Sequence, residues 1–267
     1  MAFHAHPDDE ALFTGGTLSR CNAAGHRTVV VTATAGERGL AAPGSAGSDL
    51  GTTRTSELQE AARRLGVSRV VTLGYGDSGY REPAEPPAGS FCAADPAEVA
   101  ARLAGVLAEE RADVLTVYDE HGGYGHRDHV RVREVGVRAA ALARTPVVLE
   151  ATVAREVIQR GVRLLNRLGV RPGGLRAGDL SLAFRARAEI THEVDVRDQV
   201  RAKRAALAAH ASQATGSGGA DVRTVALLSR LPGPLARRVL GREWFVEIGR
   251  TPGPDLLDDI FATLRTR

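Results

Sequence analysis

Short apolar runs rich in β-branched residues alternate with helical patterns in the first part of the chain. The runs occupy residues 27–36, 69–76, 113–123 and 146–153. Runs of this length and composition are typical of buried strands, and the first one ends at a glycine. Strands that alternate with helices form a parallel sheet with helices on both faces. The sequence therefore predicts an α/β fold of the Rossmann-like, three-layer type with a mostly parallel sheet.

Two amphipathic patterns between these runs predict helices that cover the sheet. In residues 56–67, four apolar side chains recur at helical spacing, namely Leu58, Ala61, Ala62 and Leu65. In residues 94–110, Asp95 precedes Pro96, the arrangement expected of an N-cap followed by the first helical position. The apolar stripe of this second helix consists of Val99, Leu103, Val106 and Leu107.

The remaining segments predict rim loops and a smaller C-terminal part. Proline and small residues concentrate in 40–52 and 80–95, which we expect to be long loops. Residues 151–169 combine an apolar face with an arginine-rich face, a pattern typical of a surface helix. Further expectations are helical structure over 192–213, a strand over 242–249 and a closing helix over 254–265. Residues 1–150 would form the Rossmann-like core, and residues 151–267 an elaboration that completes the same domain.

Composition argues against several classes of protein. No apolar run reaches the length of a membrane-spanning helix, and no secretory signal pattern is visible. The net charge is only +3 and aromatic residues make up 4% of the chain, so a nucleic-acid surface is not expected. The two cysteines, Cys21 and Cys92, are far apart and match no metal or disulfide pattern. We therefore expect a cytoplasmic protein with free thiols and no stable membrane insertion.

The segment HAHPDDE at residues 4–10 places two histidines and three acids after a short first strand, predicted within residues 1–5. On a helical turn, positions three apart share a face, so His6 and Asp9 can point at one ion while Asp8 stands beside it. An imidazole nitrogen and a carboxylate oxygen suit zinc, iron or another divalent first-row metal. Two ligands are too few, so a third is expected from elsewhere in the chain.

A second polar cluster, YDEHGGYGHRDHV at residues 118–130, follows another predicted strand. Because ligands of α/β sheets gather at the carboxyl ends of the strands, the two clusters should meet at one edge. His126 and His129 again have the three-residue spacing. With His129 as third ligand, two histidines and one aspartate would leave open positions for water and substrate, as in catalytic zinc sites. If both histidines bound the ion, four protein ligands would leave little capacity for chemistry.

These spacings favour a metal-dependent hydrolase, with two other classes left open. A metal-dependent phosphoesterase is compatible with the same residues. A non-enzymatic nucleotide-binding module is disfavoured because no GxGxxG segment follows the first predicted strand.

The two clusters resemble those of the LmbE-like, PIG-L-type N-acetylglucosaminyl deacetylases. AHPDDE and GGYGHRDHV carry the resemblance, and TAGERG, RTSELQEAARRLGV, GYGDSG and KRAALAAHASQ match in the same order. This family includes zinc deacetylases of mycothiol and bacillithiol biosynthesis, mycothiol-conjugate amidase and deacetylases of antibiotic pathways. The resemblance implies removal of an N-acyl group, most simply acetyl, from an N-acylated amino-sugar small molecule, with zinc or alternatively iron as cofactor. An amidase acting on a larger acyl group or a thiol conjugate is the second possibility, and the oligomeric state stays open.

The resemblance also implies roles for the residues of the first cluster and their partner. His6, Asp9 and His129 would bind the zinc ion. Asp8 would be the general base that takes a proton from the attacking water, because a carboxylate within hydrogen-bond reach can accept it.

For the second cluster, the resemblance implies that His126 stabilises the oxyanion or protonates the leaving amine. Asp128 would hold His126 and raise its pKa by favouring the imidazolium form. Tyr124 could help to polarise the carbonyl group. Arg54 and Asp77 match positions that contact sugar hydroxyls in the mycothiol-pathway relatives.

Several positions qualify the resemblance. Arg127 stands where the family usually has proline, which adds a charge at the rim of the site. The segment GYGDSGYREP lacks the tryptophan-containing insertion of the mycothiol-precursor deacetylase, which argues against assigning that one substrate. Glu10 is interpreted as a first-turn acid or a support rather than a ligand. His210 and Gln213 match a family feature for which helix-end packing is the simpler interpretation.

Overall fold

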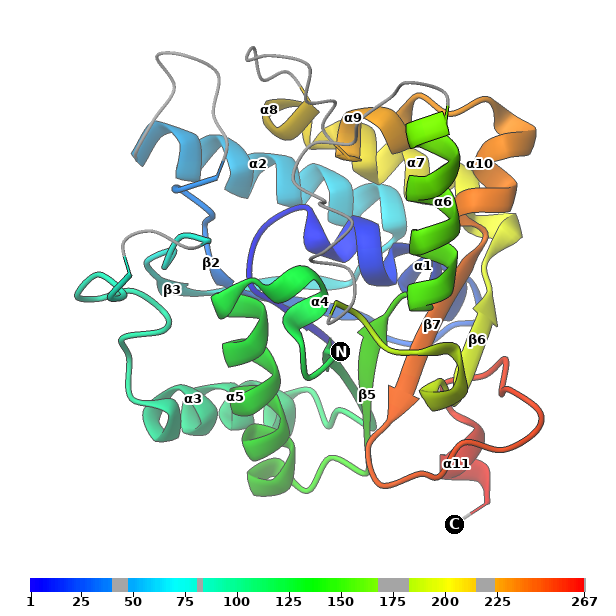
Figure 1. Cartoon of the computed structure of the whole chain (residues 1–267). Helices are drawn as coiled ribbons and strands as arrows, with labels where there is room; N and C mark the ends of the chain where they lie inside the picture. The colour runs from blue at the N-terminus through cyan, green and yellow to red at the C-terminus, as the bar shows by residue number, and fades with distance from the viewer. Residues whose placement is uncertain (40–47, 81–83, 168–182, 215–223, 267) are drawn as a thin grey trace.

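A seven-stranded sheet forms the centre of the computed structural model (Figure 1). The structure describes residues 1–39, 48–80, 84–167, 183–214 and 224–266. The strands are β1 (Ala2–His4), β2 (Val29–Thr34), β3 (Arg69–Tyr75), β4 (Val114–Tyr118), β5 (Val147–Thr152), β6 (His192–Asp195) and β7 (Arg242–Glu247). Their order is β3-β2-β1-β4-β5-β7-β6. The first five strands pair in parallel, whereas β7 runs antiparallel to both of its neighbours, which confirms the mostly parallel α/β fold.

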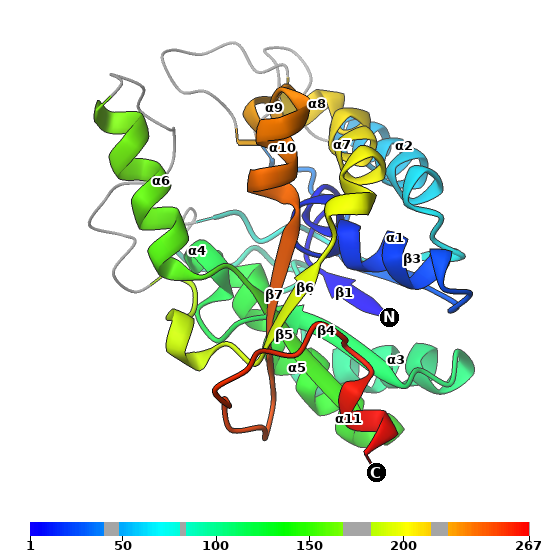
Figure 2. The same ribbon diagram turned by 90° about the vertical axis from the view of Figure 1, so that its right-hand side faces the viewer.

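Helices cover both faces of this sheet (Figure 2). One face carries α3 (Pro96–Glu109) and α5 (Arg127–Ala143), and the other carries α1 (Gly15–Ala23), α2 (Ser48–Leu65) and α7 (Val200–Ala209). The shorter or outlying elements are α4 (Gly122–Gly125), α6 (Arg155–Arg167), α8 (Ala211–Ala214), α9 (Thr224–Ser229), α10 (Gly233–Leu240), α11 (Ala262–Arg265), the π-helical turn η1 (Glu10–Thr14) and the 3₁₀ turns η3 (Arg187–Glu189) and η4 (Arg197–Gln199). None of the described helices is both long enough and apolar enough to cross a lipid bilayer.

The core lies on both sides of the sheet because successive strand residues point to opposite faces. Phe3 and Val31 pack in the cluster that includes the inner sides of α3 and α5. Their neighbours Ala2 and Val30 pack with Leu58 of α2 on the other face. All six residues of β2 are therefore buried, as its apolar run predicts. β5 pairs with β7, so residues beyond 150 extend the same sheet, while the division at residue 150 stays a prediction.

The predicted helix starts show where local capping is decisive. Asp95 caps α3 by accepting a hydrogen bond from the N–H of Ala97 at 2.8 Å, and Pro96 is its first residue, as predicted. In α2, the predicted apolar residues are buried, but the helix already begins at Ser48. The prediction of a loop over 40–52 is therefore wrong for residues 48–52, and residues 40–47 lie outside the described part. Residues 84–95 precede α3 without forming a long helix or strand, as expected.

Two C-terminal predictions are wrong. Residues 192–213 were expected to be helical throughout, but they begin as strand β6, which alternates in burial and pairs with β7; helix α7 follows after the strand. The predicted closing helix over 254–265 is reduced to α11. The reason lies in Leu257, whose N–H and carbonyl bond to Thr191 and Glu193 beside β6, at 3.0 and 2.9 Å. Backbone groups used in this way cannot join a helix.

The predicted basic surface helix is present as α6. Val162 is buried beneath it, whereas Arg160, Arg163 and Arg167 are exposed. Leu168 of its predicted apolar face lies outside the described residues. The arrangement agrees with a surface helix whose arginines face solvent.

Candidate metal centre

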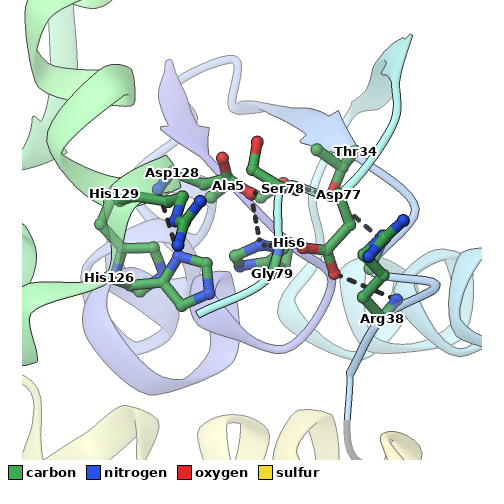
Figure 3. Close-up of polar contacts among 12 residues, drawn as sticks. Ala5, His6, Thr34, Arg38, Asp77, Ser78, Gly79, His126, Asp128 and His129 are labelled. Carbon is green, nitrogen blue, oxygen red and sulfur yellow. Dashed lines mark hydrogen bonds and ion pairs between the residues drawn. The ribbon is translucent and has the colours of Figure 1, made fainter. Parts of the chain in front are cut away.

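Three strands deliver polar side chains to one edge of the sheet. β1 lies between β2 and β4, so the segments after β1 and β4 emerge side by side. His6 follows β1, Asp77 follows β3, and the second histidine cluster follows β4. Figure 3 shows His6 between Asp77 on one side and His126 with His129 on the other. The predicted meeting of the two clusters is confirmed.

The HPDD segment forms a turn rather than the helical turn that we expected. Asp8 has a φ of 106°, a left-handed conformation that is uncommon for residues other than glycine. Asp9 turns its carboxylate back, and Oδ2 accepts a hydrogen bond from the N–H of His6 at 3.2 Å. The π-helical turn η1 then begins at Glu10, and α1 begins only at Gly15. This turn, and not a helix, places His6 and Asp9 together.

Asp9 lies between the two histidines that were predicted to share an ion with it. Its Oδ2 is 3.4 Å from Nδ1 of His6 and 3.3 Å from Nε2 of His129. Burial alone would raise the pKa of Asp9, but His129 and His6 together hold it well below its ordinary value. Nε2 of His129 is buried and has no hydrogen-bond partner among the described residues. Two imidazole nitrogens, one of them buried without a hydrogen-bond partner, and one carboxylate fit a divalent cation.

A second set of donors overlaps with the first. His6, His126 and His129 each offer one ring nitrogen, and these atoms lie within 4.8 Å of one another. The ring centroid of His126 is 4.6 Å from that of His6 and 4.9 Å from that of His129. The same distance limit is met by His6 with Asp77 and Asp128. The geometry therefore brings all the candidate ligands together. His126 lies close enough to His6 and His129 to serve as a fourth ligand.

His129 is oriented by the loop between β4 and α5. Its Nδ1 lies 3.2 Å from the carbonyl oxygen of Gly122, which directs Nε2 towards Asp9. The ring stacks on Tyr118 with centroids 4.0 Å apart and planes 3° apart. Gly122 has a φ of 62°, and a Cβ there would lie 2.9 Å from the backbone nitrogen of Val130, so the close approach requires glycine.

Asp119 braces the same loop from the end of β4. Its Oδ1 accepts hydrogen bonds from the N–H groups of His121 and Gly123, at 3.0 and 2.9 Å. Its Oδ2 accepts one from the hydroxyl of Thr152 on β5. Asp119 is fully buried, so the loop that carries His126 and His129 is fixed to two neighbouring strands.

Asp128 has a different partner from the one expected. Its Oδ2 lies 3.2 Å from Nε2 of His6 and accepts the N–H of Ser78 at 3.0 Å, while Oδ1 accepts the thiol of Cys92 at 3.0 Å. It touches His126 only through its backbone N–H, which donates to Nδ1 of that ring at 3.2 Å. The expectation that the Asp128 carboxylate holds the His126 ring is corrected accordingly.

The pKa of His126 also differs from expectation. Burial, together with the nearby His6 and His129, lowers its pKa to about 3, although Asp128 acts in the opposite direction. His126 is therefore neutral in this arrangement. Because its Nδ1 accepts a hydrogen bond from a backbone N–H, the ring proton resides on Nε2, which makes that nitrogen a donor.

Asp8 is largely withdrawn from water beside this cluster. Burial raises its pKa to about 6, although Arg54 opposes the shift. Nη2 of Arg54 lies 3.3 Å from Oδ1 of Asp8, and the same guanidinium donates to the carbonyl oxygens of Pro7 and Gly36. In this structure Arg54 therefore braces the HPDD turn.

The remaining predicted residues, Asp77 and Tyr124, lie beside the same cluster of histidines. Asp77 is buried, accepts the N–H groups of Gly79 and Arg38 at 2.8 and 3.2 Å, and lies 3.7 Å from Nε2 of His6. Tyr124 is half-buried, with its ring centroid 5.2 Å from that of His129. Burial raises the pKa of Tyr124 well above its ordinary value, so its hydroxyl stays protonated and can donate a hydrogen bond.

Several contributors were missed from the sequence. The sequence pattern assigns no role to Tyr118, and it predicts only a free thiol for Cys92. Tyr118 stacks on His129 within the same 118–130 cluster, and Cys92 reaches Asp128 across 36 residues; neither contact corresponds to a regular helical or strand spacing. Glu10 pairs with His210 at 2.7 Å across 200 residues, and the only signal for that pair was the resemblance of the HASQ segment.

Comparison with known proteins agrees with this geometry. The model of the PIG-L family, described as GlcNAc-PI de-N-acetylase, matches residues 1–140. A 1D-myo-inositol 2-acetamido-2-deoxy-alpha-D-glucopyranoside deacetylase of Kineococcus radiotolerans is 39% identical over 87% of this chain and 73% of its own length. The protein of the same name from Thermobispora bispora is 36% identical over 94% of this chain and 88% of its own.

The fold agrees as well. The solved structure of N,N'-diacetylchitobiose deacetylase from Pyrococcus horikoshii, in complex with an inhibitor, superposes with a TM-score of 0.60. It is 21% identical to this chain and covers 92% of this chain and 82% of its own, so the likeness concerns the fold. Taken together with the match over residues 1–140, these similarities show that the chain belongs to the PIG-L family.

Proposed function

We propose that this protein is a zinc-dependent hydrolase that removes an N-acetyl group from an amino-sugar-containing small molecule. The observation that carries the proposal is the meeting of His6, Asp9 and His129 around Oδ2 of Asp9, with Asp8 next to them. The names of the relatives support an N-acetylated amino sugar as the substrate class. Zinc is our first choice for the cation and iron the second, since the donor set suits both.

The reaction needs a proton acceptor, a polarised carbonyl and a proton for the departing amine. A divalent cation held by His6, Asp9 and His129 would supply Lewis-acid activation of the amide carbonyl and of the attacking water. Asp8 would accept the proton of that water as general base and would then be placed to return it to the amine nitrogen. Arg54, 3.3 Å away, holds the Asp8 carboxylate in position.

The developing oxyanion needs hydrogen-bond donors. Nε2–H of His126 and the hydroxyl of Tyr124 would donate to the oxygen of the former carbonyl, because both groups carry their protons in this site. Asp128 would contribute indirectly, by orienting His6 with its carboxylate and His126 with its backbone N–H. His126 would thus act as a neutral donor rather than as an imidazolium.

Arg54 and Asp77 remain our proposed contacts to sugar hydroxyls. Both side chains are buried and already bonded to backbone groups. A sugar hydroxyl would therefore have to replace one of these contacts or bind to a remaining lone pair of Asp77. We further infer a cytoplasmic location, which the two free cysteines support.

The decisive experiment combines metal analysis with an amine-release assay. Chelated protein should lose activity on N-acetylated sugars, including the compound named for the relatives, and added zinc should restore it. Asp8→Asn should keep its bound metal, but its kcat should fall about 10²–10⁴-fold, because the general base is removed. Full activity of metal-free protein would overturn the mechanism. Turnover of phosphate esters or of thiol conjugates in place of N-acetyl sugars would overturn the substrate class.

A further inference from the structure

The backbone at Asp8 adopts a conformation that its neighbours must impose. Its φ of 106° is strained for a residue with a side chain, and such residues persist where surrounding contacts over-determine them. The conformation sets the direction of the carboxylate that the proposed function uses as a base. The question is which contacts hold it.

Glu10 supplies one of these contacts through its side chain. Its Oε2 accepts the backbone N–H of Asp8 at 2.9 Å, so the carboxylate closes the turn from two residues further along the chain. Glu10 is fully buried. A carboxylate withdrawn from water in this way requires a strong partner for its other oxygen.

That partner is His210, from the C-terminal part of the chain. Nε2 of His210 lies 2.7 Å from Oε1 of Glu10, and both side chains are fully buried. The Glu10 carboxylate thus bridges the backbone of Asp8 and the His210 ring, with one oxygen for each. A displacement of His210 would therefore move the Glu10 carboxylate and, with it, the backbone of Asp8.

His210 itself is held at a fixed point between α7 and α8. Its N–H donates to the carbonyl oxygen of Leu207, and its carbonyl oxygen accepts the N–H of Gln213. Two residues further on, the N–H and hydroxyl of Ser212 donate to Glu57 of α2, at 2.8 and 2.6 Å. The ring therefore projects from a junction anchored to another helix, and helix-end packing alone does not account for its bond to Glu10.

We propose that Glu10 and His210 form a positioning pair that holds the backbone of Asp8 in its left-handed conformation and thereby aims the base at the reacting water. The proposal rests on the proposed function only in the role that it gives to Asp8. Neither residue touches the substrate in this scheme. Their contribution is to kcat, because a base displaced by about 1 Å can lose about 10²-fold in rate.

Two substitutions of His210 form a matched pair. In His210→Gln, the amide nitrogen can occupy the position of Nε2 and donate to Glu10, whereas in His210→Asn it corresponds to Nδ1 and falls short. We expect His210→Asn and Glu10→Ala to lower kcat about 10- to 100-fold with unchanged KM and metal content. His210→Gln should recover most of kcat.

Lys203→Met is the control for the loss of a buried ion pair. Lys203 also lies on α7 and pairs with Glu243, and both are as buried as Glu10, but Glu243 accepts the N–H groups of Gly16 and Thr17 rather than that of Asp8. We expect this variant to lose thermal stability while its kcat stays near that of the unaltered protein. If kcat falls equally in Lys203→Met, the loss of any buried ion pair in this region is enough to lower kcat, and the proposal is overturned.

A second readout does not need activity. In protein labelled with ¹⁵N-aspartate, the Asp8 amide should exchange its proton faster in His210→Asn than in the unaltered protein or in His210→Gln. If the unaltered protein releases no amine from any substrate but the exchange rates follow this order, the proposed function fails and the positioning pair stands. If the Asp8 exchange rate and kcat are the same in His210→Asn as in the unaltered protein, the positioning pair is wrong.

Discussion

Oδ2 of Asp128 lies 3.2 Å from Nε2 of His6, although 122 residues separate the two. This contact favours a proton on Nε2 and leaves the lone pair of Nδ1, the nitrogen that faces Asp9. The N–H of Ser78 and the thiol of Cys92 hold the Asp128 carboxylate in turn. The orientation of His6, which follows β1, is thus determined by groups that follow β3 and β4.

This relationship predicts a loss of metal affinity in Asp128→Asn. The amide carries no charge and can present a nitrogen to His6, so the His6 ring should lose its fixed orientation. We expect the dissociation constant of zinc to rise about 10- to 100-fold, measured by competition with a chromogenic chelator. Cys92→Ser keeps a donor for Oδ1 and should bind zinc nearly as tightly as the unaltered protein. Undiminished affinity in Asp128→Asn would rule out the orienting role.

A second prediction separates the two overlapping donor sets. Nε2 of His129 is the orphaned nitrogen next to Asp9, whereas His126 uses Nδ1 to accept a backbone N–H. His129→Ala should therefore lose most of its bound metal, and His126→Ala should retain it while its kcat falls about 10²–10³-fold, because the donor to the oxyanion is removed. Elemental analysis of the purified variants measures the metal content. Metal loss in both variants would instead identify His126 as a fourth ligand.

A third prediction concerns the packing of α5 against the sheet. A Cβ at Gly136 would lie 2.4 Å from Cγ1 of Val117 on β4, so Gly136→Ala should destabilise the protein by about 1–3 kcal/mol. Gly161, on the exposed side of α6, has no atom within 4 Å of such a Cβ, and Gly161→Ala should stabilise by about 0.5–1 kcal/mol. Urea unfolding of the two variants gives both values. If Gly136→Ala raises the free energy of unfolding as Gly161→Ala does, the close approach of α5 and β4 is contradicted.

The fourth prediction is a pH dependence of stability that originates in β6. Burial lowers the pKa of His192 to about 4, partly opposed by Glu247. At pH values between the folded pKa and the unfolded pKa of about 6.5, His192 binds a proton in the unfolded chain but not in the folded protein. Stability should therefore be unaffected by this group above pH 6.5 and should fall by up to about 3 kcal/mol as the pH drops towards 4.

His192→Gln removes this titrating group and is the matched variant. The free energy of unfolding of His192→Gln should decline less steeply between pH 6.5 and 4 than that of the unaltered protein, as measured by urea titrations at each pH. Parallel declines in the two proteins would show that His192 does not contribute.

The β-branched runs made the central strands predictable, and with them the edge at which the two clusters meet. That inference needed no side-chain geometry, because consecutive parallel strands present their carboxyl ends together. The spacing of His6 and Asp9 correctly predicted that the two side chains lie close together, but the predicted helical turn is absent. A turn with a left-handed Asp8 brings them together instead. Sequence spacing records separation along the chain and is silent about the backbone conformation between two residues.

The contacts that tune the site were not predictable. Asp128 lies two residues from His126, so local reasoning paired them, whereas the fold brings His6 to the Asp128 carboxylate. The end of the chain shows the same limit, since the pairing of Leu257 beside β6 overrides its helical pattern. In both cases a partner remote in sequence outweighed a local preference.

The bond between Glu10 and His210 has a consequence for how the protein is made. Glu10 leaves the ribosome when His210 has not yet been translated, and 200 residues separate them. At about 5–20 residues per second, roughly 10–40 s pass before the two can meet. Before that interval ends, β1, β2 and β4 have all been translated and can pair, but the Glu10 carboxylate still lacks its imidazole partner. The HPDD turn can therefore reach its final conformation only late in the synthesis of each molecule, after the C-terminal quarter of the chain has been translated.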